Sequence, residues 1–194
     1  MSKIKIAFQG EKGAYSHIAC TEIYKDAEIK NCTTFEETFK FAFENENVRA
    51  IIPLENSLAG RVADIHYLLP KYKLQIYGEH FQKVEHCLLI KKEAVLKDIK
   101  YVRSHAQAIG QCQNIIKKNN FKSIISADTA GSAKDLAESK DKSIGAIASE
   151  LAAQIYGLKI LEKNIEDEVG NITRFLIMGK VVTQPEYERS KKYI

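Results

Sequence analysis

The sequence lacks the segments that would mark a membrane, secreted or repetitive protein. No apolar run is long enough to cross a bilayer, and Met1 leads almost directly into strand-like residues at 4–8 rather than into a signal segment. No internal repeat, low-complexity segment or linker is visible. We therefore expect a cytoplasmic protein without a membrane partner.

Paired metal-ligating cysteines are also missing. The four cysteines stand at 20, 32, 87 and 112, and no two of them form a C-x-x-C pair. This spacing argues against a zinc site and against a disulfide scaffold, so buried and reduced thiols are expected. The sequence implies no metal ion and no organic cofactor.

Dense blocks of Lys and Arg interleaved with aromatic residues are absent, which argues against nucleic acid as a partner. The net charge of +4 is only mildly basic and is compatible with small anionic ligands. A content of 45% hydrophobic and 28% charged residues is ordinary for a globular protein. A chain of 194 residues can form one large domain or two small lobes.

Alternating strand and helix patterns along the chain predict an α/β fold. Strands are expected at 4–8, 29–33, 48–54, 74–91, 99–103, 121–127, 143–147, 158–161 and 173–181. Helices are expected at 15–24, 34–43, 61–69 and 148–156, and after the polar turns at 104–107 and 128–132. Thr34 and Glu37 have the spacing of a capping box at the start of the second helix.

The long strand pattern at 74–91, interrupted by Gly78, predicts that the chain crosses from one lobe to a second lobe. The strand at 173–181 is the simplest return. We therefore predict two lobes joined by two crossover strands, with lobe 1 at about 1–77 plus 174–194 and lobe 2 at about 78–173. His80 and His86 lie in the long strand pattern and are interpreted as polar strand residues rather than catalysts.

Polar residues follow several of the predicted strands. Glu55, Asn56 and Ser57 come at the carboxyl end of a strand, where open α/β sheets bind ligands. Ser104 and Thr129 lie in turns that open helices, whose N-termini offer N–H groups to an anion. Together these turns suit a dicarboxylate, although each one taken singly is also explained as a helix cap.

A polar stretch at 171–174, Asn-Ile-Thr-Arg, stands between an acidic loop and the apolar run at 175–178. Side chains held where a loop enters a rigid strand are well placed for chemistry. Asn171, Thr173 and Arg174 are therefore candidate site residues at the hinge. The alternative is that Thr173 only begins the strand.

Six stretches of the chain, spread from residue 6 to residue 178, resemble the catalytic domain of prephenate dehydratase. They are I-A-F-Q-G-E-K-G-A-Y-S (6–16), I-P-L-E-N-S-L-A-G-R-V-A-D-I-H-Y-L-L (52–69), S-H-A-Q-A-I-G-Q-C (104–112), D-T-A-G-S-A (128–133), I-G-A-I-A-S-E-L-A-A-Q-I-Y-G-L (144–158) and N-I-T-R-F-L-I-M (171–178). The resemblance implies two α/β lobes like those of a type 2 periplasmic binding protein, with the active site in the cleft between them.

The resemblance also implies a reaction and its residues. Prephenate would lose carbon dioxide and water to give phenylpyruvate, in the biosynthesis of L-phenylalanine. The catalytic candidates carried over are Thr173, Glu55, Asn56 and Gln111. The substrate-binding candidates are Ser57, Ser104, Gln107, Thr129, Asn171 and Arg174.

We expect the Thr173 hydroxyl to donate to the leaving oxygen, because such a donor is effective when it is held in place in a closed site. Arg174 is expected to hold the carboxylate that persists in the product. Glu55 would be buried and protonated, or would orient Asn56 or the leaving hydroxyl. His105 is the other candidate for the acid that acts on the leaving oxygen. The alternative is that His105 only caps a helix.

Two departures from the family pattern are visible. The usual S-H-P-Q reads S-H-A-Q at 104–107, which removes no reactive group. The chain stops at Ile194, so we expect no ACT domain after the catalytic domain, and residues 192–194 resemble the opening of an ACT strand. The chain would be either a catalytic domain cut from a longer protein or an enzyme without this regulatory domain.

Three alternatives remain open from the sequence. The chain could be an arogenate dehydratase, a cyclohexadienyl dehydratase that accepts both substrates, or a non-catalytic small-anion binding module of the same fold. Assembly as a homo-oligomer is also left open, although members of the family are commonly dimers or tetramers.

Overall fold

The computed structural model describes residues 4–180, and the chain divides into two compact units. Of the described residues, unit 1 holds 4–10, Ser16–Lys83 and 172–180, whereas unit 2 holds Glu11–Tyr15 and Val84–Asn171. The chain therefore passes between the units after residues 10, 15, 83 and 171. The sequence had suggested boundaries near 77 and 173, inside two strands that both belong entirely to unit 1.

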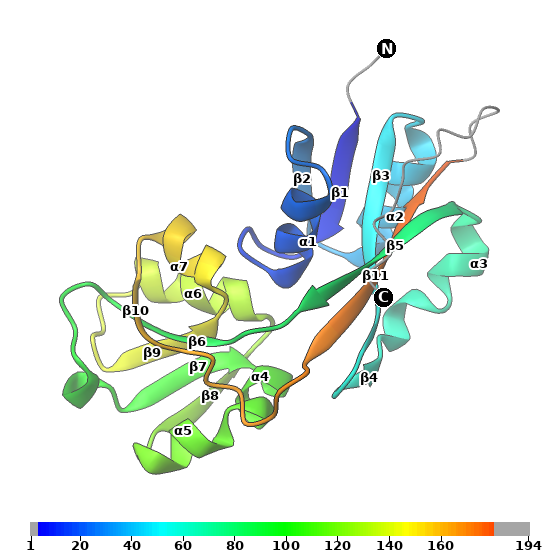
Figure 1. The fold of residues 1–194 in the computed structure, drawn as a ribbon. Coiled ribbons are helices and arrows are strands. Elements are labelled where there is room, and N and C mark those ends of the chain that lie inside the picture. The colour runs from blue at the N-terminus through cyan, green and yellow to red at the C-terminus, as the bar shows by residue number, and fades with distance from the viewer. Residues whose placement is uncertain (1–3, 181–194) are drawn as a thin grey trace. The chain divides into compact units, whose positions relative to one another are not determined.

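Unit 1 is built on a mixed sheet with the strand order β2-β1-β3-β11-β5, and β4 pairs with β3 in addition (Figure 1). Its strands are β1 (Lys5–Gln9), β2 (Glu28–Cys32), β3 (Val48–Asn56), β4 (Gly60–Arg61), β5 (Gln75–Lys83) and β11 (Ile172–Gly179). Its helices are α1 (Tyr15–Ile23, whose first residue is assigned to unit 2), α2 (Phe35–Glu44), η1 (Ala63–Ile65) and α3 (Leu68–Tyr72). Strand β1 pairs parallel with β2 and β3, whereas β11 pairs antiparallel with β3 and β5.

Apolar side chains on alternating positions of this sheet form two cores, because successive residues of a strand point to opposite faces. Phe175 and Ile177 of β11 pack in one core with Ala19 and Cys20 of α1. Leu176 and Met178 pack in the other core, which contains residues of α2 and α3. Odd-numbered residues of β11 therefore face α1, and even-numbered residues face α2 and α3.

Unit 2 is built on a second mixed sheet with the order β10-β6-β9-β7-β8. Its strands are β6 (Cys87–Ile90), β7 (Tyr101–His105), β8 (Lys122–Ser126), β9 (Ile144–Ala148) and β10 (Lys159–Lys163). Its helices are η2 (Leu96–Asp98), α4 (Ala106–Gln111), α5 (Gln113–Lys118), α6 (Thr129–Glu138) and α7 (Glu150–Tyr156). One core contains residues of α4 and α5, and the other contains residues of α6 and α7. Two mixed α/β units agree with the predicted fold class.

The capping box predicted at the start of α2 is present with a small difference. The Thr34 hydroxyl accepts a hydrogen bond from the Glu37 backbone N–H at 3.1 Å, as expected of an N-cap. The Glu37 carboxylate accepts from the backbone N–H of Thr33, one residue before the cap, at 2.8 Å. Two backbone donors at the helix end are thus satisfied.

The helix predicted at 61–69 is wrong. The segment forms a hairpin from β3 to β4, then the short helices η1 and α3. The hairpin forms because the Asn56 side-chain oxygen accepts from the backbone N–H groups of Leu58 and Ala59, at 3.0 and 2.9 Å. Gly60 then takes a φ of 80°, which favours glycine.

The long strand predicted at 74–91 is interrupted. Strand β5 ends at Lys83, and β6 begins at Cys87. Gly78 lies within β5 at a register shift opposite Ile177 and Met178, so it marks an irregularity rather than the end of the strand. The break at 84–86 places His86 outside both strands, and the earlier interpretation of His86 as a strand residue is corrected.

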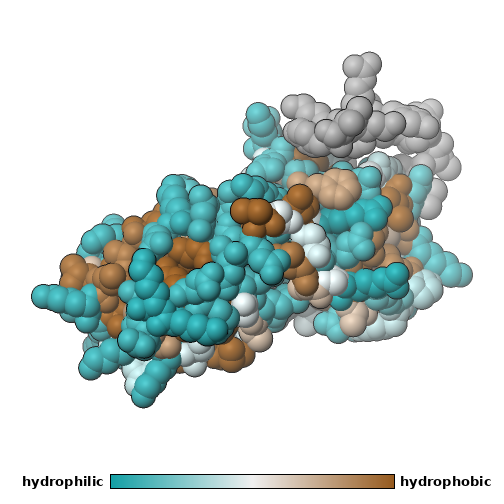
Figure 2. Space-filling view, turned by 60° about the horizontal axis from the view of Figure 1, so that its bottom comes forward, coloured by the Kyte–Doolittle hydropathy of each residue, from teal (hydrophilic) through white to brown (hydrophobic). Residues whose placement is uncertain are grey.

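The surface shown in Figure 2 is mostly hydrophilic, with hydrophobic residues in several separate patches. Single exposed apolar side chains such as Ile76 and Ile125 are ordinary on a protein surface. Across residues 4–180, no helix combines the length and the apolar character needed to cross a membrane. The residues 192–194 that resemble an ACT strand lie outside the described part of the chain.

Candidate active site

Thr173 and Asn56 face each other across the paired strands β11 and β3 in unit 1. The Asn56 amide nitrogen donates to the Thr173 hydroxyl oxygen over 2.9 Å. On the other side of β11, Thr173 pairs with Gln82 of β5, whose side chain is almost fully buried. Thr173 therefore lies between two amide side chains on the face of the sheet that packs on α1.

A β-bulge brings Asn56 to this face. The pairing of β3 with β11 shifts between Arg174 and Phe175, because Arg174 faces Glu55 whereas Phe175 faces Pro53. Leu54 is the extra residue, and an extra residue reverses which side chains point to which face. Without the bulge, Glu55 would share the face of Thr173 and Asn56 would point away from it.

The hydrogen bonds of Asn56 determine the direction of the Thr173 proton. The side-chain oxygen of Asn56 accepts from the two N–H groups of the hairpin turn, so its nitrogen must be the atom that faces Thr173. The Thr173 oxygen is thus an acceptor in this contact, and its own proton is directed elsewhere. In residues 4–180 the hydroxyl has no second hydrogen-bond partner.

Ser57 ties the start of β11 to the end of β3. Its hydroxyl oxygen accepts from the Ile172 backbone N–H at 2.9 Å, and its own backbone N–H donates to the Ile172 carbonyl at 2.9 Å. The alternative that Ser57 caps a helix is wrong, since a hairpin turn follows it. Its contacts hold the residue next to Thr173 in place.

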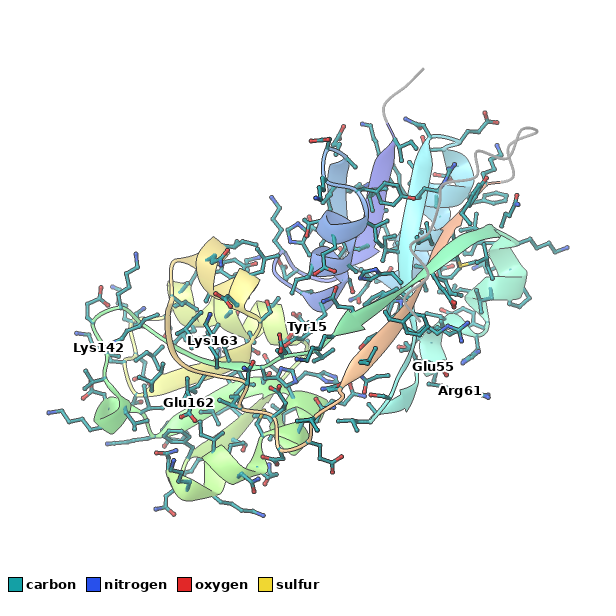
Figure 3. All side chains as sticks on the ribbon, in the orientation of Figure 1. Tyr15, Glu55, Arg61, Lys142, Glu162 and Lys163 are labelled. Atoms are coloured by element: carbon teal, nitrogen blue, oxygen red, sulfur yellow. The ribbon has the colours of Figure 1, made fainter. Side chains whose placement is uncertain are left out.

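Arg174 follows Thr173 in β11, and Glu55 precedes Asn56 in β3. Because successive strand residues point to opposite faces, Arg174 and Glu55 lie on the opposite face from Thr173. The Arg174 guanidinium contacts the Glu55 carboxylate at 3.2 Å and the Glu79 carboxylate at 2.7 Å. The Glu55 side chain is 45% exposed, so it is not buried as one of the predictions required. Figure 3 labels Glu55 beside β4, where it pairs with Arg61 in the strand register. The Arg174 guanidinium is thus held by two glutamates, and its contact with the substrate stays a prediction.

Gln111 and Asn171 meet in unit 2 at the end of a buried chain of polar groups. The Asn171 amide nitrogen donates to the Gln111 side-chain oxygen over 3.0 Å. The same oxygen lies 3.0 Å from His86 Nε2, and His86 Nδ1 lies 2.9 Å from the Tyr15 hydroxyl. Burial lowers the pKa of His86 below its ordinary 6.5 and raises the pKa of Tyr15 well above its ordinary 10.0.

The other predicted residues of unit 2 have structural roles or are exposed. Ser104 is fully buried, and its hydroxyl donates to the Ile147 carbonyl at 2.6 Å. Gln107 is exposed in the first turn of α4, and Thr129 is the first residue of α6. The expectation that Ser104 and Thr129 cap these helices is wrong, because His105 caps α4 and Asp128 caps α6. His105 thus has the capping role that was one of its two interpretations.

Sequence reasoning missed Tyr15, Gln82 and His86. Tyr15 stands in the glycine-rich motif at 6–16, but only its hydrogen bonds to Glu85 and His86 show why a phenol is needed there. His86 carried no local signal, since its partners are distant in the chain. In Figure 3 the labelled Tyr15 lies beside the elements of unit 2, in agreement with its assignment to that unit.

A family model described as prephenate dehydratase matches residues 6–182. The chain belongs to the prephenate dehydratase family. A bifunctional N-acyl-homoserine lactone acylase/prephenate dehydratase from Komagataeibacter europaeus is 43% identical, with 90% of this chain and 62% of that protein covered. Arogenate dehydratase/prephenate dehydratase 1 of Arabidopsis thaliana is 41% identical, with 98% and 49% covered. The chain thus spans only about half to two thirds of the length of these relatives.

A solved prephenate dehydratase from Arthrobacter aurescens, in complex with L-Phe, has the same fold. It superposes with a TM-score of 0.86 at 26% identity and covers 96% of this chain and 63% of that one. The fold class inferred from the resemblance is therefore confirmed. The prediction that the active site lies in a cleft between the lobes stays a prediction.

A cavity of about 380 Å³ opens on unit 1, near the carboxyl ends of β1 and β2. It is lined by Gln9, Thr33, Thr34, Phe35, Glu36, Asp64, Tyr67 and Leu68. None of these is a predicted site residue. Within residues 4–180, no cluster of three or more His, Cys, Asp or Glu side chains is arranged to hold a metal ion.

Proposed function

We propose that this chain catalyses the decarboxylating dehydration of prephenate to phenylpyruvate, as a carbon–oxygen lyase of L-phenylalanine biosynthesis. The observation that carries the proposal is the Asn56–Thr173 hydrogen bond, which leaves the Thr173 proton available to a ligand. In the reaction the bond to the ring carboxylate breaks and its electron pair enters the ring. The ring hydroxyl leaves with its own electron pair, and carbon dioxide departs as a neutral molecule.

Thr173 donates a hydrogen bond to the leaving oxygen while negative charge builds up on it. A positioned donor of this kind stabilises the transition state more than the ground state, which is what accelerates a reaction. The threonine need not lose its proton, because the departing hydroxide takes one from solvent to become water. The β-branched side chain has few rotamers, which favours a fixed position for the hydroxyl.

Arogenate is the second candidate substrate, because several relatives at about 40% identity carry arogenate dehydratase in their names. The bond changes are the same, and phenylalanine would be the product. The reacting ring and the role of Thr173 are unchanged. The two substrates differ only where arogenate has an ammonium group in place of the ketone.

The proposed compartment is the cytoplasm. All four cysteines are buried with free thiols, and burial raises the pKa of Cys87 to about 11. Thiols of this kind are typical of a reducing compartment. The assembly of the chain as a homo-oligomer stays a prediction.

The test is the release of phenylpyruvate from prephenate and of phenylalanine from arogenate by the purified chain, with the rate without enzyme subtracted. Thr173→Ala should lose about 100-fold or more in kcat, whereas Thr173→Ser should retain part of the activity because it keeps the donor. Equal rates for Thr173→Ala and the parent would refute the role of Thr173. The absence of turnover of either substrate by the parent would refute the proposed function.

A further inference from the structure

Four side chains of unit 2 form one connected chain of hydrogen-bonding contacts: Tyr15, His86, Gln111 and Asn171. The Tyr15 hydroxyl lies 2.9 Å from His86 Nδ1, and His86 Nε2 lies 3.0 Å from the Gln111 side-chain oxygen. The Asn171 amide donates to that oxygen at 3.0 Å. His86 and Asn171 are each only 2% exposed, so these contacts are shielded from water.

The backbone around His86 holds the ring in position. The His86 backbone N–H donates to the Glu166 carboxylate at 2.9 Å, and the His86 carbonyl accepts from Ile165 at 3.0 Å. Two residues earlier, the Val84 N–H donates to the Asn171 carbonyl at 2.8 Å. These contacts fix the His86 backbone, and the ring itself is held by its contacts with Tyr15 and Gln111.

The contacts assign the protons of the network. The Gln111 oxygen accepts from Asn171 and has no hydrogen of its own, so His86 Nε2 must carry the hydrogen that lies between them. A neutral imidazole has one N–H, which leaves Nδ1 as an acceptor for the Tyr15 hydroxyl. The same hydroxyl lies 2.7 Å from the Glu85 carbonyl, so its proton is shared between two acceptors.

This arrangement fixes the orientation of the Gln111 amide. With its oxygen turned toward His86 and Asn171, its NH2 group points away from the network and has no partner in the described part of the chain. The opposite tautomer, with the hydrogen on Nδ1, would draw the NH2 group of Gln111 toward His86. The outward atom would then be the oxygen, which repels an anion.

We propose that His86 and Tyr15 are positioning residues for the dehydration of the dianionic substrate, because they make Gln111 present an N–H donor rather than an oxygen. This inference rests on the proposed function and adds two residues that do not touch the substrate. The donor binds the carboxylate that persists through the reaction. Uniform binding of that kind affects KM and leaves kcat nearly unchanged.

Two variants of similar size separate positioning from packing. In His86→Gln the amide nitrogen reaches about the place of Nε2 and keeps a donor to Gln111. In His86→Asn the shorter amide reaches only the place of Nδ1 and loses that donor. We expect KM for prephenate to stay within about threefold of the parent in His86→Gln and to rise about ten- to hundredfold in His86→Asn, with kcat changed little. Tyr15→Phe should raise KM by a smaller factor. It removes the hydroxyl that favours the His86 tautomer but leaves the imidazole ring in place.

Two further measurements keep the proposal testable when a variant folds poorly or when turnover is lost. Nitrogen-15 NMR of the parent should show the His86 hydrogen on Nε2. Calorimetry with phenylpyruvate should give affinities in the same order among the variants as the KM values, and it needs no turnover.

A hydrogen on Nδ1 in the parent would overturn the proposal. Equal affinities and equal KM values in His86→Gln and His86→Asn would also overturn it, because a merely structural role would lower only their melting temperatures. Lack of turnover by the parent refutes the proposed function alone, and the NMR and binding results then decide the orientation of Gln111.

Discussion

The Asn56 amide nitrogen donates to the Thr173 hydroxyl oxygen over 2.9 Å, between residues that face each other in β3 and β11. The direction of this bond matters as much as its length. Because Asn56 is the donor, the hydroxyl is left with a proton to give. A side chain 117 positions away in the sequence thereby makes Thr173 a donor.

Asn56→Asp tests this direction with almost no change in shape. The carboxylate would still accept from Leu58 and Ala59, but it would also draw the Thr173 proton toward itself. We expect kcat/KM for prephenate to fall about 100-fold, while the melting temperature stays close to that of the parent. Asn56→Ala is the control that removes both the donor and the turn contacts, and it should lower the melting temperature as well. Activity near that of the parent in Asn56→Asp would contradict the assigned direction.

Glu55→Gln should have little effect on the reaction, because Glu55 points away from the Thr173 face. We expect kcat/KM to stay within about threefold of the parent. The ion pair with Arg174 is 37% and 45% exposed on its two sides, so its loss should lower the free energy of unfolding by less than about 1 kcal/mol. A decrease of more than about tenfold in kcat/KM would restore a direct role for this carboxylate.

Gly13→Ala should destabilise the protein more than Gly60→Ala does, although both glycines have positive φ angles of 92° and 80°. A Cβ atom at Gly13 would lie 2.7 Å from the Ala152 Cα, whereas a Cβ atom at Gly60 would meet nothing within 4 Å. We expect a loss of about 2–4 kcal/mol for Gly13→Ala and about 1 kcal/mol for Gly60→Ala, measured by urea unfolding. Equal losses of stability in the two variants would show that the positive φ angle alone, and not the space around the glycine, determines the effect.

His86 should make the folded protein less stable in acid. Burial lowers its pKa from the ordinary 6.5, although the nearby Glu166 carboxylate opposes the shift. Below about pH 7 the unfolded chain therefore binds more protons at this position than the folded chain does. The free energy of unfolding should fall as the pH decreases from about 7 through the folded pKa, by at most about 1.4 kcal/mol per pH unit.

Urea unfolding at several pH values measures how the free energy of unfolding depends on pH. The contribution of His86 should be absent in His86→Gln, so the parent should lose more stability than this variant between about pH 7 and pH 5. Identical slopes for the parent and His86→Gln would contradict the depressed pKa.

Much of the fold follows from local patterns in the sequence. The alternation of strands and helices, the Thr34 cap and the apolar run at 175–178 are each determined by neighbouring residues, and the structure contains all of them. The ordered motifs also indicated the family and selected Thr173, Asn56 and Gln111 as candidates. The helix predicted at 61–69 failed because the Asn56 side chain stabilises a hairpin, and helical periodicity does not register such a contact.

Only the tertiary structure decided which candidates lie together. Strand residues alternate between two faces, so adjacent residues such as Glu55 and Asn56 always separate, but a bulge at Leu54 determines which of them joins Thr173. That bulge depends on pairing with β11, far away in the sequence. The roles of Tyr15 and His86 depend in the same way on buried contacts between distant segments. The sequence by itself determined the elements and the candidate residues, whereas strand register and burial decided the direction of each hydrogen bond.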